Sequence, residues 1–146
     1  MKKVFLSSLF LLLVVLTEAQ LRKIPGEVTD AFMIRYPHAT HVEWKDKLHY
    51  FEASFQLNGS TITADFLSTG EWESSERIVN FEDLCRDVRE GFKKSKYAEW
   101  QPKSVHEVQE LGKPLQYRIN IQKSGIQKKN LYFDANGRLL KDPLSL

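Results

Sequence analysis

The sequence has a single cysteine, Cys85, so the chain cannot close an internal disulfide or build a zinc site from two or more thiolates. It also has little net charge, since 21 basic residues stand against 19 acidic ones, whereas proteins that bind phosphate backbones concentrate positive charge on one face. Among its 7 glycines there is no glycine-rich phosphate loop. These absences argue against a disulfide scaffold, a nucleic-acid-binding protein and a nucleotide-binding enzyme. A hydrophobic content of 42% is that of an ordinary globular domain.

The first nineteen residues have the layout of a secretory signal peptide. Lys2 and Lys3 form a positive start, residues 4–16 are apolar except for two serines, and Thr17 and Ala19 are small residues before a cleavage site at Gln20. This apolar run is shorter than the roughly 20 residues that a membrane-spanning helix needs. We therefore expect residues 20–146 to be periplasmic or secreted, without a membrane anchor after cleavage of residues 1–19.

Residues 20–80 alternate between a helical pattern and a strand pattern. Val28 and Phe32 follow one another at helical spacing, and Pro37 ends the predicted helix. A period of two in the following segments predicts half-buried antiparallel strands, and Asn58-Gly59 suits a type I′ hairpin turn. The predicted strands are residues 42–44, 49–57, 60–67 and 72–79.

Residues 81–146 show the same order of patterns. A second predicted helix carries Leu84, Cys85 and Val88 on one face, which predicts a buried, inert thiol. Strands are predicted at residues 105–111, 115–122, around Leu131 and Phe133, and at 139–140. We therefore predict an α+β fold of two tandem units, residues 20–80 and 81–146, each a helix packed on an antiparallel sheet of about four strands. The two units are expected to form one continuous domain.

Several of these motifs together resemble a known family. The motifs are Val42-Glu43-Trp44, Phe51-Glu52-Ala53-Ser54-Phe55, Asn58-Gly59, Ala64-Asp65-Phe66 and Thr69-Gly70-Glu71-Trp72, with a looser match at Tyr117-Arg118-Ile119 and residues 131–137. Through them, residues 24–140 resemble the PepSY-like family, also called beta-lactamase-inhibitor-like proteins. The resemblance implies a small exported or periplasmic protein whose tandem helix-and-sheet units are joined as in the beta-lactamase inhibitor protein. It also implies no established enzymatic activity. Core and turn residues carry the match, so it points to fold more than to function.

Residues suited to catalysis or metal binding form no converging set. His38 and His41 have an H-x-x-H spacing near Glu43, but a zinc site generally needs three or four ligands. Asp134 begins a stretch like a calcium loop, but the sixth and twelfth positions lack the glycine and glutamate that such a loop requires. We expect no catalytic residue, no metal and no cofactor, and therefore no enzyme. The alternative hypothesis is a small-molecule- or ion-responsive module that uses the His38/His41 loop or the Asp134 turn.

The sheet face opposite the predicted core is the candidate binding surface. Tyrosines and an arginine among short polar residues are typical of interface hot spots, although any half-exposed sheet can look similar. The predicted partner-binding residues are Tyr50, Glu52, Asp65, Arg118 and Tyr132. The leading hypothesis is an exported, non-enzymatic protein that binds a protein partner through this face, as an inhibitor of that partner. It predicts that Tyr50→Ala combined with Arg118→Glu abolishes binding without lowering thermal stability.

Overall fold

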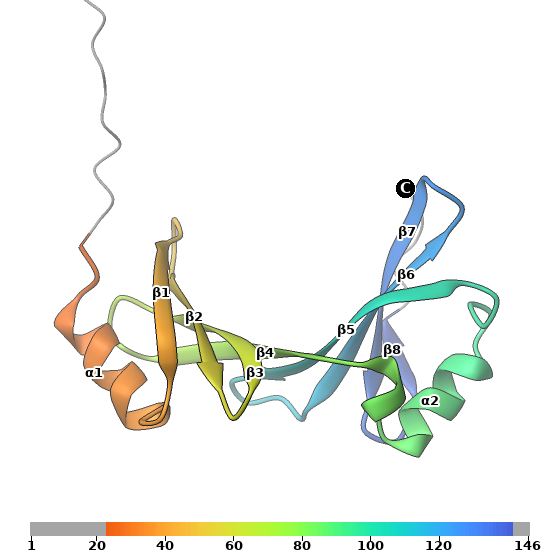
Figure 1. The fold of residues 1–146 in the computed structure, drawn as a ribbon, viewed down its shortest axis with the longest axis horizontal. Coiled ribbons are helices and arrows are strands. Elements are labelled where there is room, and N and C mark those ends of the chain that lie inside the picture. The colour runs from red at the N-terminus through yellow and green to blue at the C-terminus, as the bar shows by residue number, and fades with distance from the viewer. Residues whose placement is uncertain (1–22, 142–146) are drawn as a thin grey trace, which may run out of the picture.

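The computed structural model describes residues 23–141, so the predicted signal peptide lies outside the described residues. Two short α-helices, one 3₁₀ turn and eight strands follow each other along the chain (Figure 1). They are α1 (Gly26–Arg35), β1 (Thr40–Asp46), β2 (Phe51–Leu57), β3 (Ser60–Phe66), β4 (Trp72–Val79), η1 (Phe81–Asp83), α2 (Arg86–Lys93), β5 (Gln101–Glu110), β6 (Gln116–Lys123), β7 (Gln127–Asp134) and β8 (Leu139–Lys141).

All eight strands belong to one antiparallel sheet in the order β1-β2-β3-β4-β5-β6-β7-β8. The joint between its halves is the pairing of β4 with β5, which runs from Ser74 opposite Glu110 to Val79 opposite Val105. The predicted α+β fold of two tandem helix-on-sheet units is therefore wrong: the chain is mostly β, with helices of 10 and 8 residues on one continuous sheet. Pairing β4 with β5 removes two exposed strand edges, which two separate sheets would have left open.

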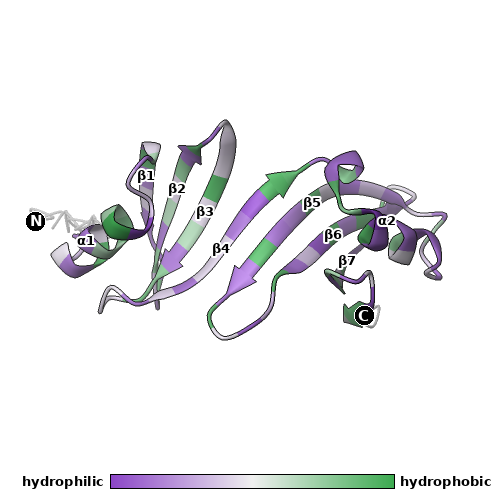
Figure 2. Ribbon diagram, turned by 90° about the horizontal axis from the view of Figure 1, so that it is seen from below, coloured by the Kyte–Doolittle hydropathy of each residue, from purple (hydrophilic) through white to green (hydrophobic). Residues whose placement is uncertain are grey.

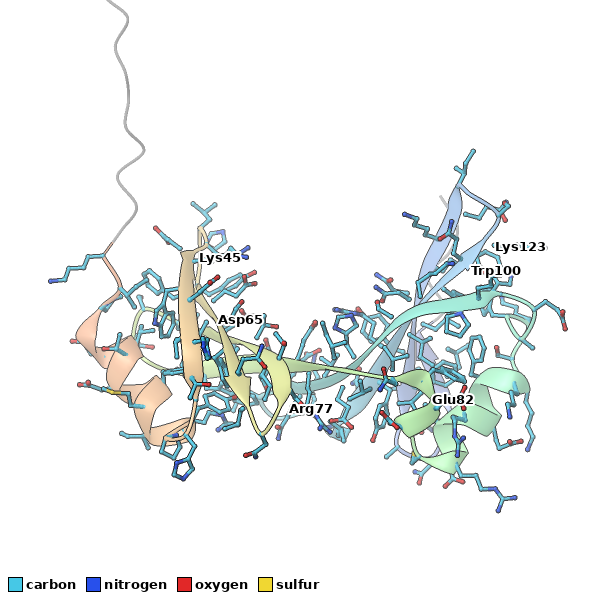
Figure 3. The ribbon with its side chains drawn as sticks, viewed as in Figure 1. Lys45, Asp65, Arg77, Glu82, Trp100 and Lys123 are labelled. Carbon is cyan, nitrogen blue, oxygen red and sulfur yellow. The ribbon has the colours of Figure 1, made fainter. Side chains whose placement is uncertain are left out.

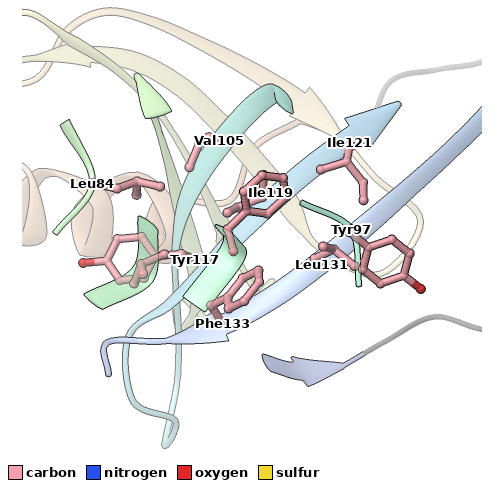
Figure 4. Close-up of a cluster of buried hydrophobic side chains, with 10 residues drawn as sticks. Leu84, Tyr97, Val105, Tyr117, Ile119, Ile121, Leu131 and Phe133 are labelled. Carbon is pink, nitrogen blue, oxygen red and sulfur yellow. The ribbon is translucent and has the colours of Figure 1, made fainter. Parts of the chain in front are cut away.

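The hydrophobic side chains gather in two clusters on the side of the sheet that carries the helices. The first cluster lies beneath α1, where Phe32 packs against Phe55 and Trp44 with ring centroids 5.0 and 5.3 Å apart. The second lies beneath η1 and α2 and is shown in Figure 4. Its buried members are Leu84, Val88, Phe92, Tyr97, Val105, Tyr117, Ile119, Ile121, Leu131 and Phe133. The alternation that places these side chains inward is visible as bands of hydropathy along the strands in Figure 2.

A polar pair occupies the helix side of the sheet between the two clusters. Arg77 on β4 lies directly opposite Glu107 on β5, and its Nε and Nη2 donate to Glu107 Oε2 at 2.9 and 2.5 Å. Ser75 and Gln109, which also lie opposite each other, continue this polar strip. The hydrophobic clusters are therefore separate, and the strands alone connect them.

Helix α2 lies very close to the turn between β7 and β8. Gly137 has a φ of 78°, and a Cβ at this position would overlap the carbonyl oxygen of Asp87. A Cβ on Gly91 would in turn overlap the carbonyl oxygen of Gly137. Only residues without a side chain permit this approach, which fixes α2 over the second hydrophobic cluster.

The environment of Cys85 differs from the prediction. The second helical segment is broken, because Leu84 and Cys85 have extended backbone between η1 and α2. Leu84 is buried, whereas Cys85 stands exposed at the N-cap of α2, with its Sγ 3.6 Å from the carbonyl oxygen of Ala135. The predicted buried thiol is therefore wrong, since the helical face that was assumed to include Cys85 does not extend that far.

Candidate functional site

The sheet is bent, so that its face away from the helices forms a trough. In Figure 1, β1 and β2 rise on one side, β6 and β7 rise on the other, and β4 and β5 cross the bottom between them. Helices α1 and α2 lie outside this bend. The trough face is lined by Tyr50, Glu52, Asp65, Ser74, Glu76, His106, Val108, Arg118 and Tyr132.

The five predicted partner-binding residues all lie on the trough face, but on its two opposite walls. Glu52 and Asp65 are direct partners across β2 and β3, and Tyr50 immediately precedes β2. On the other wall, Arg118 on β6 lies directly opposite Tyr132 on β7. Their placement on one face agrees with the alternation of the strands. Their role in binding stays a prediction.

An acidic wall surrounds Asp65. Its carboxylate accepts a hydrogen bond of 2.9 Å from Ser74 Oγ, and burial raises its pKa, with further increases from the charges of Glu52, Glu76 and Glu73. Burial also raises the pKa of the Tyr50 hydroxyl, and the charges of Asp65 and Glu52 add to this effect. Figure 3 shows Asp65 within the trough, below Lys45 on the same wall. A positively charged group on a partner would relieve the electrostatic repulsion at this wall.

The bottom of the trough holds an ion pair that the sequence pattern does not predict. Glu76 on β4 accepts two hydrogen bonds from Arg118 on β6, from Nη1 to Oε1 and from Nη2 to Oε2, both 2.6 Å long. Arg118 is therefore engaged within the chain. We now expect Arg118→Glu to place a second carboxylate against Glu76 and lower stability, contrary to the prediction that this substitution leaves stability unchanged. Alternate residues of a strand point the same way, so Glu76 lies on the same face of β4 as Ser74. Ser74 pairs with Asp65 on β3, and this places Glu76 on the trough face as well.

His106 joins this pair in an arrangement that superficially resembles a catalytic triad. Its Nδ1 lies 3.5 Å from Glu76 Oε2, and its Nε2 lies 3.2 Å from Ser104 Oγ. One feature opposes nucleophilic catalysis. Burial and the charge of Arg118 lower the pKa of His106 against the opposing effect of Glu76, so the imidazolium that must form during catalysis is disfavoured.

The two candidate ligand sites are the Asp134 turn and the His38/His41 loop, and at each of them the side chain is accounted for by the local structure. Asp134 accepts backbone hydrogen bonds from Arg138 and Asn136 at 2.9 and 3.0 Å, and these bonds, led by that from Arg138, lower its pKa. Its carboxylate therefore closes the β7–β8 turn. His41 is exposed, has a φ of 52°, and lies in the irregular start of β1 with Thr40 Oγ1 3.3 Å from its Nδ1. Within residues 23–141, no three His, Cys, Asp or Glu side chains are grouped so that they could hold a metal ion.

Solved structures of several Bacteroides proteins are similar to the chain. No protein-family model and no curated protein matches it. It is similar to a DUF2874 family protein from Bacteroides ovatus, with 28% identity and a TM-score of 0.78 over 82% of this chain and 86% of that one. A BLIP-like protein from Bacteroides fragilis is 26% identical with a TM-score of 0.77, over 82% of this chain and 86% of that one. A "putative periplasmic" protein from Bacteroides eggerthii, 23% identical, has a TM-score of 0.75 over 82% of this chain and 88% of that one.

These neighbours support the coarser part of the sequence interpretation. The BLIP-like description agrees with the beta-lactamase-inhibitor-like half of the resemblance, and the periplasmic description agrees with the predicted location. None of the three descriptions names an enzymatic activity. In the described part of the chain, no helix has the length and hydrophobicity to cross a membrane.

Proposed function

We propose that the chain is an exported, non-enzymatic protein that binds another protein in its trough, as an inhibitor or binding subunit of that partner. The observation that carries the proposal is the bent sheet, which leaves one whole face uncovered by helices and lines it with tyrosines and charged side chains. Such residues favour protein recognition, because tyrosine combines apolar area with a polar group and few rotatable bonds. The finer assignment to the PepSY-like family is part of the same proposal.

The polarity of the trough also suggests what its partner offers. Asp65 accepts a hydrogen bond from the neutral hydroxyl of Ser74, while burial and then neighbouring carboxylates raise its pKa. A lysine or arginine from a partner would pair with Asp65 where the trough is partly desolvated, and such charge-assisted hydrogen bonds are stronger than neutral ones. The partner segment is therefore expected to be convex and to carry a positive charge.

The test is an affinity capture with residues 20–146 as bait in envelope extract of the source cell. The trough variant carries Tyr50→Ala and Tyr132→Ala, because Arg118 is engaged with Glu76 and would confound binding with stability. The matched control carries Gln109→Ala and Leu115→Ala, two exposed residues of which Gln109 lies on the helix side of the sheet.

Capture of a protein by the wild type and the control, but not by the trough variant, would support the proposal if all three proteins have the same Tm. Capture by all three would place the contact elsewhere and contradict it. Capture of nothing by the wild type would also count against it, and would leave the small-ligand hypothesis to be examined by thermal-shift screening.

A further inference from the structure

One hairpin tip combines an exposed aliphatic residue with positive charge. Ile126 is 93% exposed, the highest value among the large hydrophobic side chains of the described residues. It lies in the turn Ser124–Ile126 between β6 and β7, next to Gly125. A Cβ added to Gly125 would meet no other atom within 4 Å. In Figure 1 this hairpin, in blue, rises above the neighbouring strand β5. Nothing in the described chain therefore buries this side chain, and only another surface can do so.

The strands that flank this turn carry only basic charged residues near it. Residues 119–131 contain three basic side chains, Lys123, Lys128 and Lys129, and no acidic one. Lys123 and Lys128 stand directly beside the turn, opposite Gln127 and Gln122, and Figure 3 shows Lys123 on this arm of the trough. Residues 95–106, which lead into and begin β5, contribute two lysines and one acidic residue. The tip therefore combines one exposed aliphatic side chain with exposed lysines.

The same asymmetry extends over residues 23–141. Residues 23–79 carry nine acidic and five basic side chains, whereas residues 80–141 carry eight acidic and thirteen basic ones. The positive potential is thus concentrated at the end of the molecule that bears the β6–β7 tip. A nearly neutral total charge conceals this separation.

The β1–β2 tip, residues 47–50, has a weaker version of the same features. Leu48 is 83% exposed there, and Lys47 precedes it, although Lys47 lies 3.6 Å from Glu52 and is partly neutralised. Figure 1 shows that both hairpins rise on the open side of the trough. A flat surface could therefore meet both tips together.

We propose that the β6–β7 tip contacts an anionic lipid bilayer: Ile126 inserts between headgroups while Lys123 and Lys128 bind lipid phosphates. Leu48 is the second, weaker contact. Peripheral membrane binding of this kind combines buried apolar area with attraction between basic residues and anionic lipids. A lipid surface suits the tip better than a protein, because lysine is depleted from protein interfaces and the tip offers no aromatic or arginine anchor. The argument for this contact rests on the tip residues and not on the proposed trough function, but a bilayer held by both tips would cover the open side of the trough.

The experiment measures co-sedimentation of residues 20–146 with vesicles of phosphatidylglycerol or of phosphatidylcholine, at low and at high salt. We expect binding to phosphatidylglycerol vesicles, release by salt, and no binding to phosphatidylcholine. Ile126→Ser should weaken binding roughly tenfold through loss of buried apolar area, and Lys123→Gln with Lys128→Gln should weaken it by more than about tenfold.

Matched controls are available on α1 and at the end of α2. Ile34→Ser removes another aliphatic side chain that is 82% exposed, and Lys93→Gln with Lys94→Gln removes another adjacent pair of exposed lysines. Both controls should bind vesicles like the wild type. The proposal fails if the wild type does not bind phosphatidylglycerol, if it binds both lipids equally, or if the controls lose as much as the tip variants. It also fails if the tip variants keep vesicle binding but lose a captured protein, because the tip would then be a protein contact.

Discussion

Glu76 and Arg118 are 42 residues apart in the sequence, yet their side chains form two hydrogen bonds of 2.6 Å that span strand β5. Their side chains are 28% and 21% exposed, so solvent only partly screens the attraction between them. Because the planar guanidinium matches both carboxylate oxygens, the pair fixes its own geometry as well as supplying energy. It therefore ties the two halves of the trough floor together.

Removing the charge of Glu76 should destabilise the fold. Glu76→Gln leaves the partly buried guanidinium of Arg118 without its counterion, and we expect a loss of about 1–2 kcal/mol in the free energy of unfolding. The control is Glu107→Gln, which breaks a similar pair on the helix side where Arg77 is 44% exposed, and it should cost less than about 1 kcal/mol. Urea denaturation measures both. Equal losses of unfolding free energy in the two variants would show that the deeper burial of the Glu76–Arg118 pair does not make it more stabilising.

Gly137→Ala should be among the most damaging small substitutions. It adds strain at a φ of 78° and drives a methyl group into the carbonyl oxygen of Asp87, so α2 must move. We expect a loss of about 3 kcal/mol or more in unfolding free energy. Gly112→Ala separates the two causes, because Gly112 has a similar φ of 71° but open space around it, and should cost only about 1 kcal/mol. Thermal and urea unfolding would show the difference, and a Gly137 variant as stable as the Gly112 variant would refute the close packing of α2.

The charge of Asp65 should oppose folding at neutral pH. Burial, followed by neighbouring carboxylates, raises its pKa above the ordinary 3.8, so the folded state binds the proton more tightly than the unfolded state. The resulting stability is complete below pH 3.8 and is lost as pH rises through the folded-state pKa. Asp65→Asn keeps an acceptor for Ser74 and should raise Tm at pH 7, with a gain that shrinks as the pH is lowered towards 4. A Tm unchanged or lowered at pH 7 would contradict this sign.

Asp134 should show the opposite behaviour. Its pKa is lowered first by the backbone hydrogen bond from Arg138, so the ionised form favours folding above the ordinary pKa, and this contribution is lost as pH falls through the folded-state value. Asp134→Asn should therefore lower Tm at pH 7 and have a diminishing effect towards acidic pH. Paired Tm profiles of the two variants against pH test the signs together, and parallel profiles would contradict at least one of the two assignments.

Cys85 should react while the protein is folded. Because its side chain is exposed at the N-cap of α2, a maleimide or Ellman's reagent should modify one thiol per chain under native conditions. Cys85→Ser should give no reaction and serve as the blank. Reaction only after addition of urea would show that the thiol is buried after all, as the helical pattern alone had suggested.

The strands that have a clear period of two were predictable from that pattern. The alternation from Phe51 to Leu57 is observed as alternate burial along β2, and the Asn58-Gly59 turn has positive φ at both residues. The pairing of β4 with β5 was not predictable in the same way. Alternation identifies a strand and its faces, but not which edge it joins after a connection as long as residues 80–100.

The sequence predicts on which face of the sheet the candidate residues lie, but not which side chains they pair with. Parity along the strands correctly puts Arg118 and Tyr132 on the side opposite the core. That Arg118 is held by Glu76 depends on the order of β4, β5 and β6, which the sequence pattern does not contain. Likewise, the exposure of Cys85 depends on a local break in the backbone at Leu84, where the apolar spacing still suggests a continuous helix.

Every strand after β1 pairs with the strand that precedes it in the sequence, so the strands can pair in the order in which they are synthesised. Each of the seven pairings joins strands that are neighbours in the sequence, so none waits for a distant segment, and loop-closure entropy stays small. The one long interval, from β4 to β5, contains α2 and η1, which bring their own local contacts. Such a meander allows folding to advance strand by strand as the polypeptide is synthesised.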